Sequence, residues 1–313
     1  MEYRRLGSSG LEVSAIGLGT SNFGRRNMGQ EESRRVVREA VELGVNFIDT
    51  ANTYGTAEEF VGRACKGIRD QVVLATKVSG PMGEGPNRRG ASRKHIIGQV
   101  EASLRRLRTD YIDLYQLHIP DPGTPMEETL RTFDNLVRQG KVRYVGCSNL
   151  AAWQVAQAME LSRSLALAPF VSVQPEYNML HRGVEKELVP CCEAYGLGIV
   201  PYHPLDSGFL TGKYRRGRSA PEGTRFYHAP SVAENILTES RFDILEELES
   251  YATERGHSLL ELAIGWILAR PAVSCVIIGA SRAGQLEANV RAATWRLSQE
   301  DMQELDEILG DGS

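Results

Sequence analysis

Short, mostly apolar runs alternate along the chain with longer stretches whose apolar residues recur at helical spacing. Runs of this kind, apolar on both faces, are typical of parallel strands covered on both sides. We predict eight such strands, at Ala15–Thr20, Val45–Asp49, Val72–Lys77, Tyr111–His118, Val142–Cys147, Phe170–Gln174, Gly198–Tyr202 and Ser274–Ile278.

Amphipathic helices are predicted between these strands. Glu31–Leu43 closes at Gly44, Ser92–Leu107 begins with a serine suited to cap it, and Met126–Arg138 ends before a glycine. Successive β-α units without an antiparallel run favour a closed (β/α)8 TIM barrel over an open doubly wound sheet.

Three segments fall outside the repeat. Tyr3–Val13 contains a Gly-Ser-Ser-Gly turn and predicts a β-hairpin plug, and Ser298–Leu309 predicts an extra C-terminal helix. The long connection from His203 to about Asn235 predicts a functional lid. Since no shift in composition marks a linker, we expect residues 1–313 to form a single domain.

Composition narrows the class of protein. With 42% hydrophobic and 24% charged residues the chain is an ordinary globular one, and a net charge of −4 without a basic stripe makes nucleic acid an unexpected partner. The five cysteines include no C-x-x-C pair, and the N-terminus lacks an apolar leader. We therefore expect a cytoplasmic protein with no membrane span and no metal site.

Polar residues stand where the predicted strands end, which is where barrel enzymes build their active sites. The strands end in or run into an acid, a lysine, a histidine, amides, a serine and a tyrosine: Asp49, Lys77, His118, Ser148, Asn149, Gln174 and Tyr202. A purely apolar core would not require these residue types.

Each of the reactive side chains has a structural interpretation as well. Asp49 could organise the turn that follows it, Lys77 could extend to solvent, and His118 and Tyr54 could fill space in the core. Four such groups on neighbouring strands of one barrel, facing one mouth, favour an active site instead.

Residues 49–55, Asp-Thr-Ala-Asn-Thr-Tyr-Gly, resemble the signature of the aldo-keto reductase family. Further matching segments follow in the family's order along nearly the whole chain, at residues 75–77, 110–118, 140–149, 174–178, 202–213 and 278–289. The set is specific because the matches recur at the predicted strand ends.

The resemblance implies reversible, NADPH-dependent reduction of an aldehyde or ketone to an alcohol, with Tyr54 as general acid and base. An unperturbed tyrosine has a pKa of ~10, so the site needs a cation that favours the phenolate. Lys77 would supply the cation and Asp49 would hold it charged. His118 would orient the substrate carbonyl oxygen.

The family binds its nicotinamide cofactor without a dinucleotide fold, and the sequence lacks a G-x-G-x-x-G motif. The resemblance implies NADPH or NADP+, with NADH possible. The implied cofactor-binding residues are Gly19, Thr20, Asp49, Ser148, Asn149, Gln174, Tyr202, Pro204, Leu205, Gly208, Leu210, Lys213, Arg225, Gly279, Ser281, Arg282, Gln285 and Asn289.

The sequence departs from the family pattern at two places, and two other functions stay open. Many relatives carry tryptophan where this chain has Ser21 and Asn22, and serine where it has His203. One rival is a lyase that forms a Schiff base through Lys77. The other is a cofactor-binding regulatory subunit similar to potassium-channel β-subunits. Substrate, direction and the choice between monomer and homo-oligomer stay open.

Overall fold

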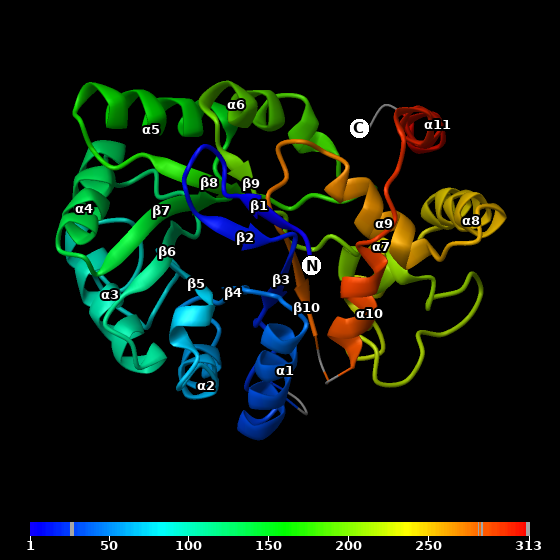
Figure 1. Cartoon of the computed structure of the whole chain (residues 1–313), viewed down its shortest axis with the longest axis horizontal. Helices are drawn as coiled ribbons and strands as arrows, with labels where there is room; N and C mark the ends of the chain where they lie inside the picture. The colour runs from blue at the N-terminus through cyan, green and yellow to red at the C-terminus, as the bar shows by residue number, and fades with distance from the viewer. Residues whose placement is uncertain (26–27, 281, 283, 311–313) are drawn as a thin grey trace.

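The computed structural model describes residues 1–25, 28–280, 282 and 284–310. Over these residues eight parallel strands form one curled sheet in the order β10-β3-β4-β5-β6-β7-β8-β9 (Figure 1). Their bounds are β3 (Ile16–Gly19), β4 (Phe47–Asp49), β5 (Val73–Val78), β6 (Ile112–Leu117), β7 (Val142–Ser148), β8 (Phe170–Gln174), β9 (Gly198–Ile199) and β10 (Val276–Gly279). The predicted (β/α)8 fold is confirmed.

Hydrogen bonds from β9 and the residues after it to the segment before β10 and to β10 itself close the sheet. The amide of Ile199 donates to the carbonyl of Ala272 at 2.8 Å, and the amide of Ser274 donates to the carbonyl of Ile199 at 2.9 Å. Further along, the amide of Ile277 donates to the carbonyl of Pro201 at 3.0 Å. The first and last strands of the sheet therefore meet as in a barrel.

Helices surround the barrel and complete its outer core (Figure 1). Phe47, Leu114 and Ile277 belong to the apolar set inside the barrel, whereas Leu74 and Phe133 belong to the larger set beneath the helices. The helices of the described residues are α1 (Gln30–Glu42), α2 (Ala57–Ala64), α3 (Arg93–Leu107), α4 (Met126–Arg138), α5 (Ala152–Ser164), α6 (Leu188–Tyr195), α7 (Pro230–Ile236), α8 (Glu239–Glu254), α9 (Leu259–Leu268), α10 (Gln285–Ala292) and α11 (Gln299–Leu309).

The observed elements differ from the predicted ones mainly at their ends. Strand β9 is three residues shorter than the predicted Gly198–Tyr202, since Pro201 has no amide hydrogen for a ladder. Ser92 caps α3 as expected, accepting a hydrogen bond from the amide of His95 at 3.4 Å. The expected lid is partly helical, because it contains the short 3-10 helix η3 (Asp206–Thr211) and most of α7.

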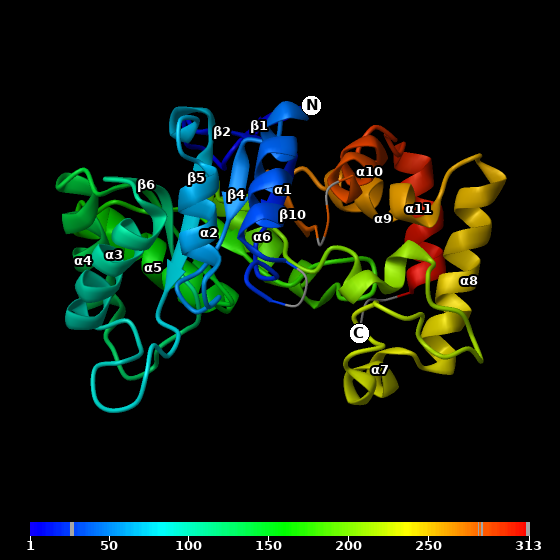
Figure 2. The ribbon, with the colours of Figure 1, turned by 90° about the horizontal axis from the view of Figure 1, so that it is seen from below.

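The N-terminal hairpin closes one end of the barrel. Strands β1 (Tyr3–Arg5) and β2 (Glu12–Ser14) pair antiparallel, and they lie at the top of Figure 2, away from α7 at the bottom. The side chain of Asn46, just before β4, accepts from the amide of Ser14 at 2.7 Å. The opposite end, where the parallel strands finish, is left for the site.

Gly7 provides a test of this closure. Its φ is +59°, and an added Cβ would lie 2.6 Å from the carbonyl oxygen of Gly196 and from the amide of Gly198. We expect Gly7→Ala to lower the free energy of unfolding by about 3 kcal/mol, through positive φ and overpacking. If residues 1–313 are one domain, circular dichroism will show a single unfolding transition in Gly7→Ala, at a lower denaturant concentration than in the parent.

Gly10→Ala is the matched control, because nothing lies within 4 Å of its added Cβ and its φ is not in the left-handed region. Equal stability of the two variants would contradict a tightly seated hairpin.

Candidate active site

The ends of neighbouring parallel strands bring the predicted polar residues to one rim of the barrel. Asp49 is the last residue of β4, Lys77 lies in β5, His118 follows β6, and Ser148 and Gln174 end β7 and β8. Parallel strands finish at the same edge, so these side chains share one layer of the molecule. Tyr54 reaches this rim from the turn between β4 and α2.

A buried ion pair forms the centre of the site. The ammonium Nζ of Lys77 donates to Oδ2 of Asp49 at 2.5 Å and to the carbonyl of Thr50 at 2.9 Å. The residues are 0% and 3% exposed, respectively, so each charge depends on the other for its stabilisation. Burial works to lower the pKa of Lys77, but Asp49 and Tyr54 outweigh it and raise this pKa above its usual value.

Tyr54 lies between the lysine and the histidine. Lys77 Nζ is 5.2 Å from the centroid of the Tyr54 ring, and the Tyr54 and His118 rings meet edge to face with centroids 5.8 Å apart. The interaction with Tyr54 is one of the causes that raise the pKa of Lys77. The phenol is therefore flanked by an ammonium on one side and an imidazole on the other.

The imidazole of His118 is held neutral. Burial, followed by the nearby charge of Lys77, lowers the pKa of His118 to about 3. A neutral imidazole offers one N–H donor and one acceptor nitrogen. At physiological pH His118 can thus donate a hydrogen bond to an oxygen without adding a second positive charge.

Two glutamines hold the other oxygen of Asp49. Gln174 Nε2 donates to Oδ1 at 3.0 Å, and Gln116 Nε2 donates to the same atom at 3.3 Å. Gln174 is among the predicted cofactor-binding residues, whereas Gln116 is not among the predicted site residues. The available signal was an amide between Leu114 and His118, which share one face of the strand.

A second polar network extends along the rim. Ser148 Oγ donates to the carbonyl of Gln174 at 2.7 Å, and Asn149 Nδ2 donates to Ser148 Oγ and to the His118 carbonyl at 3.0 Å each. The hydroxyl of Tyr202 donates to Asn149 Oδ1 at 2.9 Å. Burial, with Glu176 and Tyr54 nearby, raises the pKa of Tyr202 to about 12, so it stays a neutral phenol.

The segment after β9 carries an unpaired cation. Gly208 has a φ of +91°, and an added Cβ would lie 2.4 Å from Nζ of Lys213. Burial lowers the pKa of Lys213, and among the described residues no carboxylate forms an ion pair with it. Pro204, Leu205 and Leu210 belong to the same segment, and Leu210 is fully buried.

The other basic residues of this segment are engaged with α8. Arg215 pairs with Glu249, and Arg216 pairs with three carboxylates: Glu239, Asp243 and Glu246. Arg241 of α8 reaches back to the buried Asp206. These ion pairs fasten the segment to α8 and leave Lys213 as the better candidate for a phosphate contact.

The residues expected at the far end of the cofactor are placed less tightly. Arg225 and Arg282 are exposed, and Ser281 lies outside the described residues. Asn289 is 3% exposed, and its Nδ2 has no partner in the described part of the chain. The amide of Gly284, before α10, already donates to Glu39 of α1, so this helix end is not wholly free for phosphate.

The remaining expected positions line the junction of β3, β4 and β10. Gly19 is paired with Gly279, and Thr20 donates both its amide and its hydroxyl to the carbonyl of Asp49 at 2.9 Å. Gln285 is the first residue of α10. These contacts fix the backbone around Asp49.

The two departures noted in the sequence also lie near this rim. Nδ2 of Asn22 would be 3.6 Å from a Cβ added at Gly279. His203 Nδ1 lies 3.2 Å from Oε1 of Glu176, and this hydrogen bond is the main cause of the lowered pKa of Glu176.

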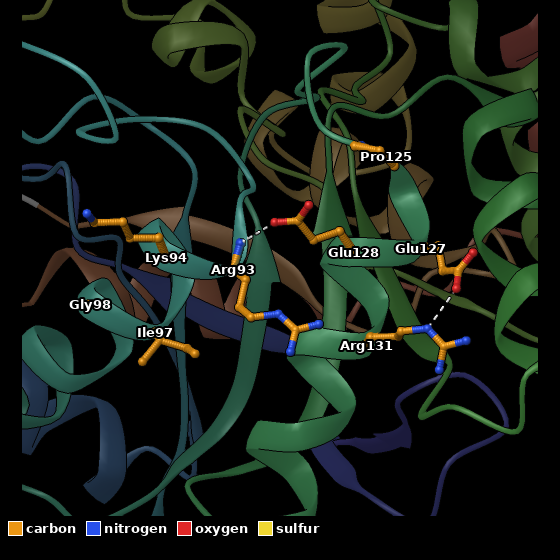
Figure 3. Close-up of a pocket in the computed structure, with 8 residues that line it drawn as sticks. All are labelled: Arg93, Lys94, Ile97, Gly98, Pro125, Glu127, Glu128 and Arg131. Atoms are coloured by element: carbon orange, nitrogen blue, oxygen red, sulfur yellow. Dashed lines mark hydrogen bonds and ion pairs between the residues drawn. The ribbon is translucent and has the colours of Figure 1, made fainter.

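An open groove also lies outside the barrel, between α3 and α4 (Figure 3). Glu127 and Arg131 pair across one turn of α4, and the amide of Arg93 donates to Glu128 at 2.9 Å. None of the strand-end residues lines this groove. The groove therefore lies apart from the predicted site residues.

The chain is similar to known proteins along nearly its whole length. The model of the Aldo/keto reductase family matches residues 15–310. The chain is 36% identical to L-glyceraldehyde 3-phosphate reductase of Escherichia coli, with 100% of this chain and 93% of the relative covered. It is 37% identical to aldo-keto reductase YhdN of Bacillus subtilis, with 99% and 94% covered.

A third relative carries a different description. The chain is 38% identical to a putative voltage-gated potassium channel subunit beta of Schizosaccharomyces pombe, with 98% of this chain and 93% of that protein covered. Across the described ranges, no helix combines the length and apolar character needed to cross a membrane.

The lowered pKa of His118 predicts acid sensitivity. The unfolded chain takes up a proton at this histidine near pH 6.5, whereas the folded chain does so only near pH 3. Between these values the unfolded state binds more protons, so stability falls as pH falls. When the pH falls from 6.5 to 5, we expect the parent to lose about 1.5 kcal/mol more of its free energy of unfolding than His118→Gln loses. Urea unfolding at the two pH values measures this difference.

His228→Gln is the control, because His228 is exposed. If both variants keep the acid sensitivity of the parent, His118 is not held neutral.

Proposed function

The chain belongs to the aldo/keto reductase family, and on this premise we propose that it is an NADPH-dependent enzyme that reversibly reduces an aldehyde or ketone to an alcohol. The chain is an oxidoreductase of that family, whose members generally use NAD(P)H. The observation that carries the finer proposal is the buried Lys77–Asp49 pair beside Tyr54.

Tyr54 is the proposed proton donor. The ammonium of Lys77, held charged by Asp49, stabilises the phenolate left when Tyr54 gives its proton to the nascent alkoxide. In the oxidative direction the same phenolate takes the proton of the alcohol. Asp49 acts on the phenol only through Lys77, to which it is hydrogen-bonded.

His118 is the proposed partner of the substrate oxygen. Being neutral, it donates an N–H to the carbonyl oxygen and stabilises the negative charge that develops there. An imidazolium in this position would stand beside Lys77 and raise the cost of burying both cations.

The nicotinamide cofactor, when bound, supplies or accepts the hydride. The residues present fit such a group, because within the described residues Lys213 is a cation without an ion pair and Asn289 has a buried amide nitrogen without a partner. Ser148, Asn149 and Gln174 would hold the carboxamide. Gln174 uses one N–H on Asp49 and keeps a second N–H and its oxygen for that purpose.

The remaining cofactor contacts are proposed from the family resemblance. Tyr202 would stack on the nicotinamide, and residues 204–213 would cover the pyrophosphate. Lys213, Arg225 and Arg282 support NADPH over NADH, because each adds positive charge on the side expected to meet the 2′-phosphate. A cytoplasmic location, and a monomer or homo-oligomer, stay predictions.

A regulatory role is the second candidate function. It is favoured by the 38% identity to the putative potassium channel subunit beta of Schizosaccharomyces pombe. NADPH binding with very slow turnover of every aldehyde offered would support it. A Schiff-base lyase is disfavoured by the site itself, since a nucleophilic amine must be neutral and the raised pKa of Lys77 keeps it protonated.

Replacing the proposed acid tests the enzyme directly. We expect Tyr54→Phe to lower kcat for NADPH-dependent aldehyde reduction by about 10²-fold, because general acid catalysis contributes on that scale. Cofactor affinity, measured by quenching of protein fluorescence, should stay within about twofold, as the phenyl ring is retained. Tyr3→Phe, in the hairpin at the opposite end of the barrel, is the control. Full activity in Tyr54→Phe would overturn the assignment.

Lys213 tests the cofactor assignment. We expect Lys213→Met to raise the Kd for NADPH about tenfold, because a hydrogen bond between charged groups contributes about 1.5 kcal/mol. Lys186→Met, at an exposed position, should leave the Kd unchanged. The ratio of the Kd of Lys213→Met to the Kd of Lys186→Met should decrease in concentrated salt, because salt screens the attraction between Lys213 and the phosphate. An unchanged Kd in Lys213→Met would remove Lys213 from the cofactor site.

A further inference from the structure

We propose that Gln116 is a positioning residue of this reaction: its amide fixes the Asp49 carboxylate so that Lys77 stays aimed at Tyr54. The inference rests on the proposed reductase function and adds a residue that is not among the predicted site residues. It starts from the hydrogen bond of 3.3 Å between Gln116 Nε2 and Asp49 Oδ1.

The position of Gln116 follows from barrel geometry. Side chains from alternate strands share a layer inside such a barrel. Asp49 on β4, Gln116 on β6 and Gln174 on β8 meet in this way, and their residues are 3%, 0% and 2% exposed. The two amides thus reach the carboxylate from two other strands, across the barrel interior.

The contacts of Asp49 divide between its two oxygens. Oδ2 accepts from Lys77 at 2.5 Å, while Oδ1 accepts from both glutamines. Donors on both oxygens resist rotation of the carboxylate plane. The orientation of Asp49 therefore depends on the amides as well as on the lysine.

The constraint continues to the phenol. An ammonium has three N–H donors. Lys77 directs one to Asp49 and one to the carbonyl of Thr50, and its Nζ lies 5.2 Å from the centroid of the Tyr54 ring. A turn of the carboxylate would move the ammonium and weaken its interaction with the phenolate.

Gln116 is an unfavourable choice on packing grounds alone. The amide must present its nitrogen to Asp49, because an ionised carboxylate only accepts hydrogen bonds. This leaves Oε1 buried without a partner in the described structure. The neighbouring interior residues Leu114 and Ala75 are apolar, so a leucine would suit the packing and would avoid an unpaired acceptor.

Other ionisable groups lie near the same carboxylate and could contribute to a pH profile. They are Lys77 from β5, His118 after β6, Tyr202 after β9 and Cys275 before β10. Burial and then the charge of Asp49 raise the pKa of Cys275. Of these, His118, Tyr202 and Cys275 are held neutral by burial near pH 7. Changes at Gln116 are therefore expected to act through Asp49, Lys77 and Tyr54.

Two substitutions separate positioning from packing. Gln116→Leu removes the donor, so the charge of Asp49 is less compensated and the potential at Tyr54 becomes more negative. Gln116→Glu places a second carboxylate against Asp49, which strengthens this effect once both are ionised. A more negative potential disfavours the phenolate, so the phenolate should form at higher pH in both variants.

The experiment measures kcat for NADP+-dependent alcohol oxidation against pH, using the full chain. The rising limb, which reports the phenolate base, should move upward by about 0.5 pH unit in Gln116→Leu and about 1 unit in Gln116→Glu. KM for the alcohol and the Kd for NADP+ should change less than kcat. Tyr115→Phe is the matched control, because Tyr115 is the adjacent buried residue on the outer face of β6 and its hydroxyl has no partner.

A second measurement does not depend on turnover. Ultraviolet difference titration follows the ionisation of Tyr54, with Tyr54→Phe on the same background as the blank. The pH at which the phenolate forms should rise in the order parent, Gln116→Leu, Gln116→Glu. Folded variants that keep the parent's profile and titration would overturn the positioning role. A parent with no reductase activity but a shifted Tyr54 titration in the variants would overturn only the proposed function.

Discussion

The ion pair between Lys77 and Asp49 is the interaction on which the site depends. Both charges lie inside the barrel, where an unpaired ammonium or carboxylate would be strongly destabilising. The surrounding contacts are arranged to satisfy them: the carbonyl of Thr50 accepts from the lysine, and Gln116 and Gln174 donate to the carboxylate. Burial lowers the pKa of His118, the charge of Lys77 adds to this effect, and the ring of Tyr54 lies 5.2 Å from the same cation, so the pair shapes the electrostatics of the rim.

Much of the fold was predictable because the barrel imposes a regular pattern on the sequence. Buried parallel strands must be apolar on both faces, and Phe170–Gln174 and Met126–Arg138 were predicted with the bounds observed. The errors occur where hydrogen bonding, rather than hydrophobicity, decides. Pro201 shortens β9 because it lacks an amide hydrogen, and the expected lid contains η3, whose backbone has positive φ at Ser207 and Gly208.

The site could be predicted in part. Residues that end strands share a rim in any parallel barrel, so Asp49, Lys77 and His118 could be grouped from spacing alone. Contacts across the interior depend on the stagger between strands, which the sequence does not display, and the bond from Gln116 to Asp49 was missed for this reason. Long-range ion pairs were hidden as well: only the folded chain shows that Arg216 meets the carboxylates of α8.

The fastening of the segment after β9 to α8 has a mechanical consequence. Arg215 and Arg216 form ion pairs with carboxylates on successive turns of that helix, and Arg241 of the helix forms an ion pair with Asp206. The attraction in each of these contacts weakens as its charges separate, so a displacement of α8 is expected to draw the segment with it. Because α11 packs against α8 in turn, a displacement of α11 is expected to reach the segment after β9 without passing through the strands.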